Sequence, residues 1–258
     1  MCIRDRFPTK SVQTRRDNDK ELANLLRVFG HMPIEAIAPM HIRQYMDLRG
    51  QVAKVRANRE KALFSHIFNK AREWGFTTAQ NPCQGVKGFK ETGRSRYVTD
   101  EEFDRVRANA HCTVVDAMDI ALLTGQRPAD VLKIKRTDIR DGALWIVQNK
   151  TGARLGIEIT GELSAVIERI NQRPRKAISA FLIQDENGQP LSQGALRSRF
   201  DKARTLAKVD FQFRDIRAKA ATDTGDLGHS QKLLGHKNRE MTEHYVKSRK
   251  GERVKPSR

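Results

Sequence analysis

Two cationic residues in the second half of the sequence stand where regular patterns end. Arg127 follows the apolar run 114–123 and precedes Asp130, an acidic residue that could anchor its guanidinium. Lys150 lies in Asn-Lys-Thr-Gly between two short β-rich runs, and this pattern predicts the tip of a hairpin. Taken singly, each residue is more simply explained as part of a solvated ion pair or a turn.

Four further residues occupy the last 50 positions with equally regular spacing. Arg214 and Arg217 are three residues apart at the start of an alanine-rich segment, which predicts one helical face able to clamp a phosphate. His236 ends an apolar turn at Leu-Gly-His, and Tyr245 follows nine residues later. Two solvated arginines and two core or interface aromatic residues are the simpler alternatives.

Together these side chains suit chemistry on a phosphodiester, whose anionic oxygens make it a poor electrophile. The guanidiniums of Arg127 and Arg217 would neutralise charge as a pentacoordinate transition state develops. The Tyr245 hydroxyl is a usable nucleophile when nearby cations stabilise its anion. Lys150 is the candidate general acid for the departing 5′ oxygen, and His236 could hydrogen-bond the phosphate or shuttle a proton.

The charge of the chain points to a polyanionic partner. Its 258 residues carry 49 Lys and Arg against 31 Asp and Glu, a formal net charge of +18. Residues 1–92 hold 17 basic and 9 acidic residues, and the remainder holds 32 and 22. Both parts are therefore basic, as suits two domains that meet the same polyanion.

Several protein classes lack their usual signals in this sequence. There is no phosphate-binding glycine loop, no dinucleotide-binding glycine pattern and no His-Glu-x-x-His helix, which disfavours an NTPase, a Rossmann dehydrogenase and a zincin. Cys2, Cys83 and Cys112 are far apart, which argues against a disulfide framework or zinc site and predicts buried or incidental thiols. With no membrane-spanning or secretion signal, we expect a cytosolic chain.

The elements that must position these residues are mostly helical. Apolar periodicity predicts helices in the first region over 22–29, 40–48 and 55–74. In the second region, a capping signature at Thr99 opens one helix, and further helices are predicted over 114–123, 163–170 and 193–207. The predicted strands are 143–147, 155–159 and, as a third strand, 181–183.

In order and spacing, these segments resemble the catalytic domain of the tyrosine recombinase or phage integrase family over roughly 99–246. The preceding region resembles the family's core-type DNA-binding domain through residues 58–63 and 71–74. The resemblance implies a mainly α fold with a small antiparallel sheet (α+β). We expect five segments: 1–11, disordered or a scar; 12–86, the helical core-type DNA-binding domain; 87–96, a basic linker; 97–246, the catalytic domain; and 247–258, a basic C-terminal tail.

The resemblance also implies a role for each residue. Arg127 and Arg217 would be the two phosphate-clamping arginines, Lys150 the hairpin lysine and general acid, His236 the Leu-Gly-His histidine and Tyr245 the nucleophile.

Arg214 stands where the family most often has a histidine. Arginine stays charged at ordinary pH, so Arg214 can supply electrostatics but cannot act as a general base. The Tyr245 proton would then go to water or to another base, with His229, His244 and Asp215 nearby in sequence.

The activity implied is that of a site-specific DNA recombinase that integrates a viral genome through a covalent 3′-phosphotyrosyl intermediate, without metal, ATP or another cofactor. The implied partners are double-stranded DNA, further copies of the chain in a tetramer on DNA, and accessory DNA-bending proteins, in the bacterial cytoplasm near the nucleoid. Because the tail 247–258 has little apolar surface, we expect a free monomer. Two alternatives are a non-catalytic DNA-binding descendant and a type IB topoisomerase.

Overall fold

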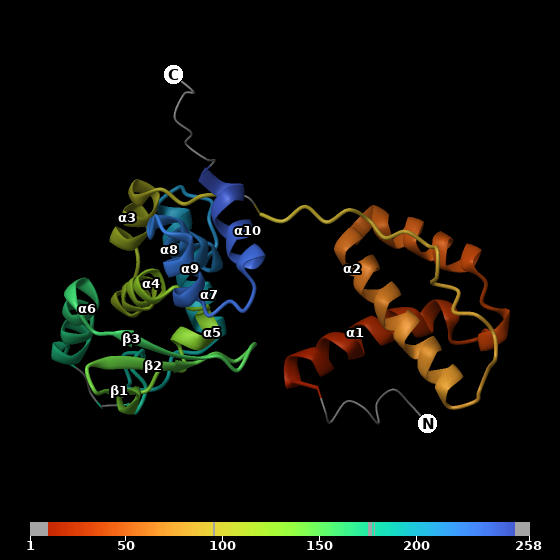
Figure 1. The fold of residues 1–258 in the computed structure, drawn as a ribbon, viewed down its shortest axis with the longest axis horizontal. Helices are drawn as coiled ribbons and strands as arrows, with labels where there is room; N and C mark the ends of the chain where they lie inside the picture. The colour runs from red at the N-terminus through yellow and green to blue at the C-terminus, as the bar shows by residue number, and fades with distance from the viewer. Residues whose placement is uncertain (1–9, 95, 175–176, 178, 251–258) are drawn as a thin grey trace, which may run out of the picture. The chain divides into compact units, whose positions relative to one another are not determined.

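The structure, a computed structural model, describes residues 10–94, 96–174, 177 and 179–250. Its internal contacts divide the chain into two compact units, Met1–Gly93 and Arg94–Arg258. The division falls within the segment 87–96, where the sequence predicts a linker (Figure 1). Most of the predicted segment 1–11 and residues 251–258 of the predicted tail lie outside the described residues.

The first unit is built from two long helices, α1 (Val12–Phe29) and α2 (Pro39–Glu73), with a 3-10 turn at Ile34–Ala36 between them. The Ser11 side chain accepts a hydrogen bond from the Thr14 backbone N–H, so α1 begins earlier than the apolar pattern 22–29 predicts. The two helices predicted over 40–48 and 55–74 run together as α2, with a kink at Ala53 (φ −154°).

An aromatic core and one buried carboxylate hold α1 against α2. The Phe29 ring packs 5.0 Å from the Phe64 ring and 5.4 Å from the Tyr45 ring, measured between centroids. Glu60, only 1% exposed, accepts hydrogen bonds from the Tyr45 hydroxyl and from Arg49. The buried charge is therefore paired, as a stable core requires.

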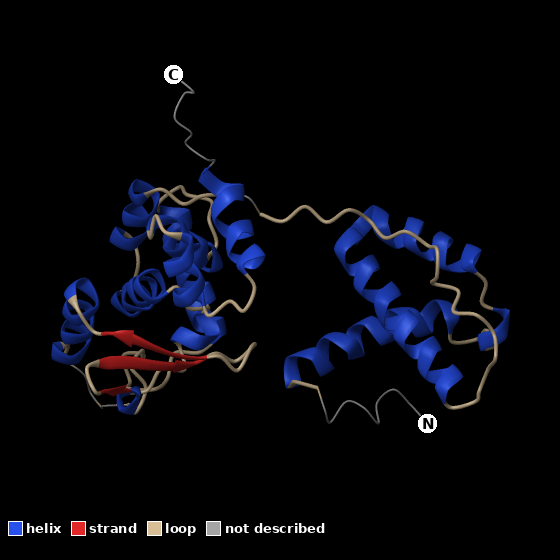
Figure 2. Ribbon diagram, viewed as in Figure 1, coloured by secondary structure: helices blue, strands red, loops and turns tan. Residues whose placement is uncertain are grey.

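The second unit combines helices with a small antiparallel sheet, which lies along its lower edge in Figure 2, and this confirms the predicted fold class. The strands β1 (Ile139–Arg140), β2 (Ala143–Val147) and β3 (Arg154–Glu158) pair in that order. The helices are α3 (Asp100–Ala108), α4 (Cys112–Thr124), α5 (Pro128–Val131), α6 (Gly161–Gln172), α7 (Gln193–Leu206), α8 (Ile216–Asp223), α9 (Leu227–Leu234) and α10 (Arg239–Lys250). Within the described ranges, no helix is long and apolar enough to cross a membrane.

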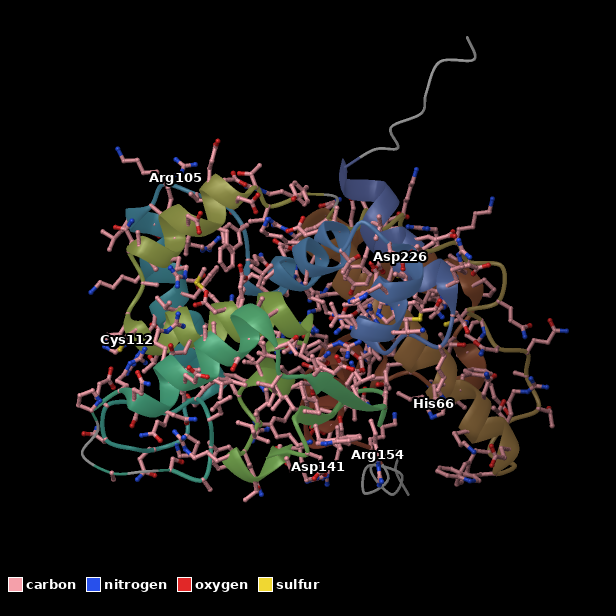
Figure 3. All side chains as sticks on the ribbon, turned by 60° about the vertical axis from the view of Figure 1, so that its left-hand side comes forward. His66, Arg105, Cys112, Asp141, Arg154 and Asp226 are labelled. Atoms are coloured by element: carbon pink, nitrogen blue, oxygen red, sulfur yellow. The ribbon has the colours of Figure 1, made fainter. Side chains whose placement is uncertain are left out.

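The third strand of the sheet is β1, so the strand predicted over 181–183 is wrong. Phe181 forms a single bridge to Lys135 outside the sheet. Leu182 and Ile183 are both buried, whereas a strand with one core face alternates buried and exposed residues. The turn that joins β1 to β2 contains Asp141 (φ 52°), which Figure 3 labels at the edge of the sheet.

The apolar helix α4 forms the centre of the second unit, as its sequence predicts. Val114, Met118 and Ile120 on it have no exposed surface. The helix ends at Gly125, which has a left-handed backbone (φ 65°), and a Cβ at this position would lie 3.0 Å from the Leu234 side chain. This close approach brings the segment after α4 against the end of α9, where the candidate site forms.

Candidate active site

Arg217 joins the ends of α4 and α9. Its side chain is almost fully buried, and its Nη1 donates to the Gly125 carbonyl oxygen at 2.6 Å. Its Nη2 donates to the Leu234 carbonyl oxygen at 2.8 Å and lies 3.1 Å from His236 Nε2. A rigid guanidinium fork thus holds two chain segments that are far apart in the sequence.

The electrostatics of this cluster favour a bound anion. Burial, followed by the charge of Arg127, lowers the pKa of Arg217 to about 10, while Tyr245 and Asp130 act in the opposite direction. Because a guanidinium is a permanent cation in proteins, two positive charges are held close together in partial isolation from water. An anion between them would relieve this repulsion.

His236 is buried and neutral. Burial, together with the charges of Arg217 and Arg127, lowers the pKa of His236 to about 4. Because a guanidinium has no acceptor, His236 Nε2 must accept from Arg217, and Nδ1 then donates to Thr242 Oγ1 at 3.0 Å. Two hydrogen bonds therefore fix the tautomer and the ring orientation.

We expect His236 to make the fold sensitive to mild acid. Its pKa is lower in the folded chain than the ordinary value of about 6.5, so the unfolded chain binds the proton more readily. The stability that neutral His236 contributes is fully present above about pH 6.5 and is lost as the pH falls towards 4. The melting temperature of the wild type should therefore fall more steeply between pH 7 and 4.5 than that of His236→Gln.

The exposed residue His229 provides the matched control for that series. His229→Gln should follow the wild-type pH profile of the melting temperature. Parallel curves for the wild type and His236→Gln would contradict the assignment of a buried, neutral imidazole.

Arg127 immediately precedes α5, in which Pro128 is the first residue. Its partly exposed side chain donates from Nη1 to Gln148 Oε1 at 3.3 Å, and the same nitrogen lies 3.8 Å from Asp130 Oδ2. The acidic anchor expected from the sequence is therefore a long ion pair. Asp130 also accepts a hydrogen bond from the Asn149 backbone N–H at 2.8 Å, which ties the β2–β3 turn to α5.

The side chain of Lys150 is exposed at the turn between β2 and β3, where the sequence predicts a hairpin tip. Next to it, Asn149 accepts a hydrogen bond from Lys133 at 2.6 Å. The base of the turn is thus anchored while the lysine extends into solvent.

Tyr245 is half-buried on α10, beside the other site residues. Its ring centroid lies 5.5 Å from that of His236, and its side chain is close enough to Arg217 to raise the pKa of that guanidinium. The structure therefore brings together Arg127, Arg217, His236 and Tyr245, which come from four separate segments of the chain.

Arg214 lies outside the helix that carries Arg217, and only Arg217 is buried, so the predicted shared helical face is wrong. Residues Phe213–Asp215 form a 3-10 turn before α8, held by the Gln212 backbone N–H donating to Asp215 Oδ2 at 2.9 Å. This turn leaves Arg214 exposed while Arg217 is buried at the start of α8.

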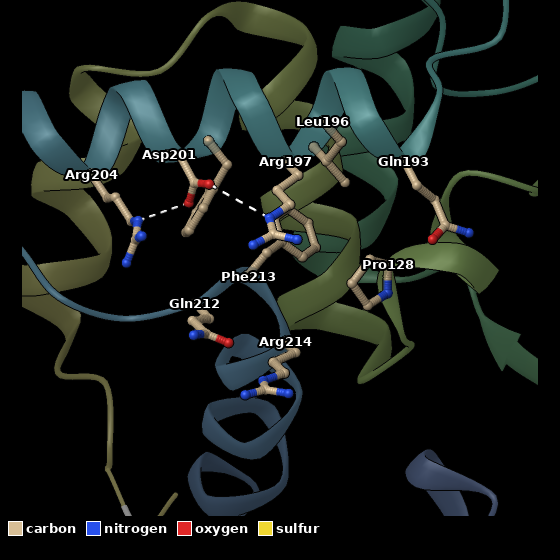
Figure 4. A pocket seen from close by; sticks show the side chains of 10 residues that line it. Pro128, Gln193, Leu196, Arg197, Asp201, Arg204, Gln212, Phe213 and Arg214 are labelled. Carbon is tan, nitrogen blue, oxygen red and sulfur yellow. Dashed lines mark ion pairs between the residues drawn. The ribbon is translucent and has the colours of Figure 1, made fainter. Parts of the chain in front are cut away.

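Arg214 instead lines a cavity of about 480 Å³ between the 3-10 turn and α7 (Figure 4). Arg197 and Arg204 line the same cavity, and both form ion pairs with Asp201. The arginine at position 214 supplies positive charge there and cannot act as a general base.

The three bases considered for the Tyr245 proton differ in their surroundings. Asp215 is buried, and its Oδ2 lies 3.3 Å from Arg94 Nε. The same oxygen accepts a hydrogen bond from the Gln212 backbone N–H. His229 is exposed in the first turn of α9, whose capping residue Asp226 is labelled in Figure 3. The side chain of His244 lies outside the described residues.

Sequence reasoning missed the polar residues that support the site. Gln126, Gln148 and Thr242 are buried and contribute side-chain hydrogen bonds around Arg127, Arg217 and His236. These residues follow no spacing pattern in the sequence. The only sequence feature that could have pointed to them is that they are polar residues close in the chain to the candidate catalytic ones. Among the residues described, no three His, Cys, Asp or Glu side chains are grouped so that they could hold a metal ion.

Comparison with known proteins identifies the class to which this fold and site belong. Residues 99–252, more than half of the chain, match the phage integrase family. The chain therefore belongs to the phage integrase family, a class of tyrosine-type site-specific DNA recombinases, as the resemblance in sequence predicts.

Two curated relatives and one solved structure agree with this assignment. Prophage integrase IntE of Escherichia coli K12 is 28% identical over 257 residues, which cover 91% of this chain and 68% of the relative. The integrase of Escherichia phage HK022 is 31% identical over 199 residues, which cover 71% of this chain and 55% of that protein. The chain thus spans between about half and two thirds of the length of these relatives. A lambda integrase tetramer bound to a Holliday junction has the same fold, with a TM-score of 0.86, 22% identity, and coverage of 96% of this chain and 75% of that chain.

Proposed function

We propose that the chain cuts and rejoins double-stranded DNA at specific sites through a 3′-phosphotyrosyl intermediate on Tyr245. The meeting of two guanidiniums, one of them buried, with a tyrosine hydroxyl carries this proposal, because that set both attracts a phosphodiester and can attack it. The family assignment supports the same reaction class.

In the proposed first step, Tyr245 Oη attacks phosphorus and the bond to the 5′ oxygen breaks. Arg127 and Arg217 bind the non-bridging oxygens, whose charge grows in the transition state. Lys150 delivers a proton to the departing 5′ oxygen from the exposed turn. The second step reverses these roles, as a 5′ hydroxyl attacks the phosphotyrosine and releases Tyr245. The energy of the broken bond is retained throughout, so the reaction needs no ATP.

His236 and Arg214 act on charge and geometry in this scheme. His236 accepts from Arg217 and thereby orients the guanidinium, and its pKa of about 4 makes it a weak base. Arg214 is permanently charged and attracts the DNA backbone from the cavity beside α7. The Tyr245 proton therefore passes to water in this proposal.

We extend the proposal to the partners of the whole protein. The first unit would act as a core-type DNA-binding domain, and the free monomer would assemble into a tetramer only on DNA, near the bacterial nucleoid and with accessory DNA-bending proteins. The tetramer that lambda integrase forms on a Holliday junction supports this assembly. Integration of a phage genome is the reaction that the integrase relatives suggest.

The decisive experiment incubates the chain with attachment-region DNA of its host and then denatures the mixture with SDS. A protein–DNA adduct that survives SDS supports the proposal, whereas DNA binding without an adduct would favour a non-catalytic descendant. Strand exchange between two DNA sites, rather than relaxation of one supercoiled circle, separates recombination from topoisomerase activity.

We expect the DNA affinity to depend steeply on salt. Both units are basic, so binding should be dominated by phosphate neutralisation and release of counterions. The logarithm of the association constant should fall linearly with the logarithm of salt concentration, by about 0.9 for each phosphate contact. Fluorescence anisotropy over a salt series measures this slope, and a salt-insensitive complex would contradict the expectation.

A further inference from the structure

We propose that Gln148 is a positioning residue that fixes Arg127 and the Lys150 turn relative to each other and to the end of α9. This inference rests on the proposed function, in which Arg127 binds the non-bridging oxygens of the scissile phosphate and Lys150 protonates its departing 5′ oxygen. Gln148 ends the β2 side of the hairpin and is only 1% exposed.

The side-chain amide of Gln148 uses all of its hydrogen-bonding capacity. Its Nε2 donates to Gln126 Oε1 at 2.8 Å and to the Leu234 carbonyl oxygen at 2.9 Å. Its Oε1 accepts from Thr151 Oγ1 at 2.7 Å and from Arg127 Nη1 at 3.3 Å. Two donors and two acceptor sites are the full complement of a glutamine amide.

The chemistry of these partners allows only one orientation of the amide. A guanidinium can only donate and a carbonyl oxygen can only accept, so Oε1 must face Arg127 and Nε2 must face Leu234. In the reverse orientation the amide NH₂ would face the Arg127 guanidinium, so that two donors meet, and the amide oxygen would face the Leu234 carbonyl oxygen, so that two acceptors meet. Leaving buried groups without partners in this way costs free energy. Gln148 therefore has a fixed direction and transmits it to its neighbours.

A second amide holds Gln148 in place. Gln126, which immediately precedes Arg127 in the chain, donates from Nε2 to the Thr124 carbonyl oxygen at 2.8 Å and to the Leu233 carbonyl oxygen at 2.9 Å. The Gly235 backbone leaves room for this network, since a Cβ there would lie 3.1 Å from Gln148 Nε2. The hairpin, the Arg127 segment and the end of α9 are therefore joined by two buried glutamines.

The link to Lys150 runs through the next residue. Thr151 follows Lys150 directly, and its hydroxyl donates to Gln148 across the turn. The turn is also closed by the Gly152 backbone N–H, which donates to the Gln148 carbonyl oxygen at 2.9 Å. The Thr151 hydroxyl is thus the contact through which Gln148 sets the direction of the proposed general acid.

The proposal separates two effects that one chemical probe can distinguish. Replacing the bridging 5′ oxygen of the scissile phosphate by sulfur creates a thiolate leaving group, which departs without a proton because thiols are far stronger acids than alcohols. A defect in the placement of Lys150 should disappear on this substrate, and a defect in the placement of Arg127 should persist.

The experiment measures single-turnover adduct formation by the full chain on both DNA substrates. Thr151→Val should slow cleavage of ordinary DNA by about 10-fold to 100-fold, as misplacement of a catalytic group does, and cleave the sulfur substrate at nearly the wild-type rate. Thr151→Ser keeps the hydroxyl and should restore the rate on ordinary DNA. Gln148→Leu should slow both substrates, since it also releases Arg127, with DNA affinity unchanged.

Gln184→Leu is the matched control for the loss of a buried glutamine. Gln184 is 4% exposed, donates to the Ala177 carbonyl oxygen and accepts from the Ser179 backbone N–H, with no contact to the site in these bonds. The Gln184→Leu variant should cleave both substrates at the wild-type rate, and its melting temperature checks that it is folded.

Two sets of results would overturn the proposal. Three results would each refute the positioning role while leaving the proposed function intact. They are equal slowing of Thr151→Val on both substrates, wild-type rates for Thr151→Val and Gln148→Leu, and a failure of Thr151→Ser to restore the rate. A wild-type chain that forms no adduct on either substrate would refute the proposed function, and the inference with it.

Discussion

Tyr245→Phe should abolish the covalent protein–DNA adduct while leaving folding and DNA binding almost unchanged. The substitution removes only the hydroxyl that attacks phosphorus, and the ring that packs against His236 remains. The measurement compares SDS-resistant adduct on a denaturing gel with DNA affinity by anisotropy. We expect wild-type affinity and no detectable adduct.

The two other tyrosines of the chain serve as controls. Tyr45 donates its hydroxyl proton to buried Glu60 in the first unit, and burial raises its pKa well above the ordinary value. Tyr97 donates to Asp223 at 2.6 Å, with Lys219 against its ring. Tyr97→Phe should therefore retain the adduct, and an adduct that persists in Tyr245→Phe would show that another residue is the nucleophile.

Arg127→Ala should reduce the rate of cleavage far more than the affinity for DNA. The guanidinium contacts oxygens whose charge grows in the transition state, and loss of such a donor costs about 100-fold to 1000-fold in rate. The partly exposed side chain has side-chain contacts to Gln148 and Asp130, so the fold should survive its removal. Single-turnover cleavage and equilibrium binding on the same DNA measure the two effects.

The exposed Arg105 on α3 supplies a control with the same change of charge. Arg105→Ala should leave the cleavage rate of bound DNA unchanged. Equal losses of binding and cleavage in Arg127→Ala would make Arg127 an ordinary phosphate anchor. Arg217 is a less direct probe, because its removal would also leave the buried carbonyl oxygen of Gly125 without this donor. The carbonyl oxygen of Leu234 would lose one of its two donors and keep the bond from Gln148.

Local sequence patterns predicted the elements that depend on neighbouring residues alone. The capping signature at Thr99 forms as expected, with Glu102 and Thr99 exchanging hydrogen bonds. Gly125 and Gly235 end their helices in the left-handed conformation that glycine favours. The sheet shows the limit of such patterns, since the two-residue strand β1 is too short to produce a recognisable period.

The residue types that carry the proposed chemistry were also found in the sequence, because their order and spacing match the family. Arg127, Arg217, His236 and Tyr245 converge in the structure. Their roles as clamp, orienting group and nucleophile stay predictions until the variants above are measured.

Only the tertiary structure determined which of these side chains is buried, and what holds them. Arg217 and Arg214 are three residues apart, yet Arg217 is buried on α8 against two carbonyl oxygens and Arg214 is exposed on the 3-10 turn before it. The low pKa of His236 and the hydrogen bonds of Gln148 have the same origin. Both depend on the packing of the ends of α4, β2 and α9 against one another. Gln148 and Leu234 are 86 residues apart, and no local pattern in the sequence encodes a contact over that separation.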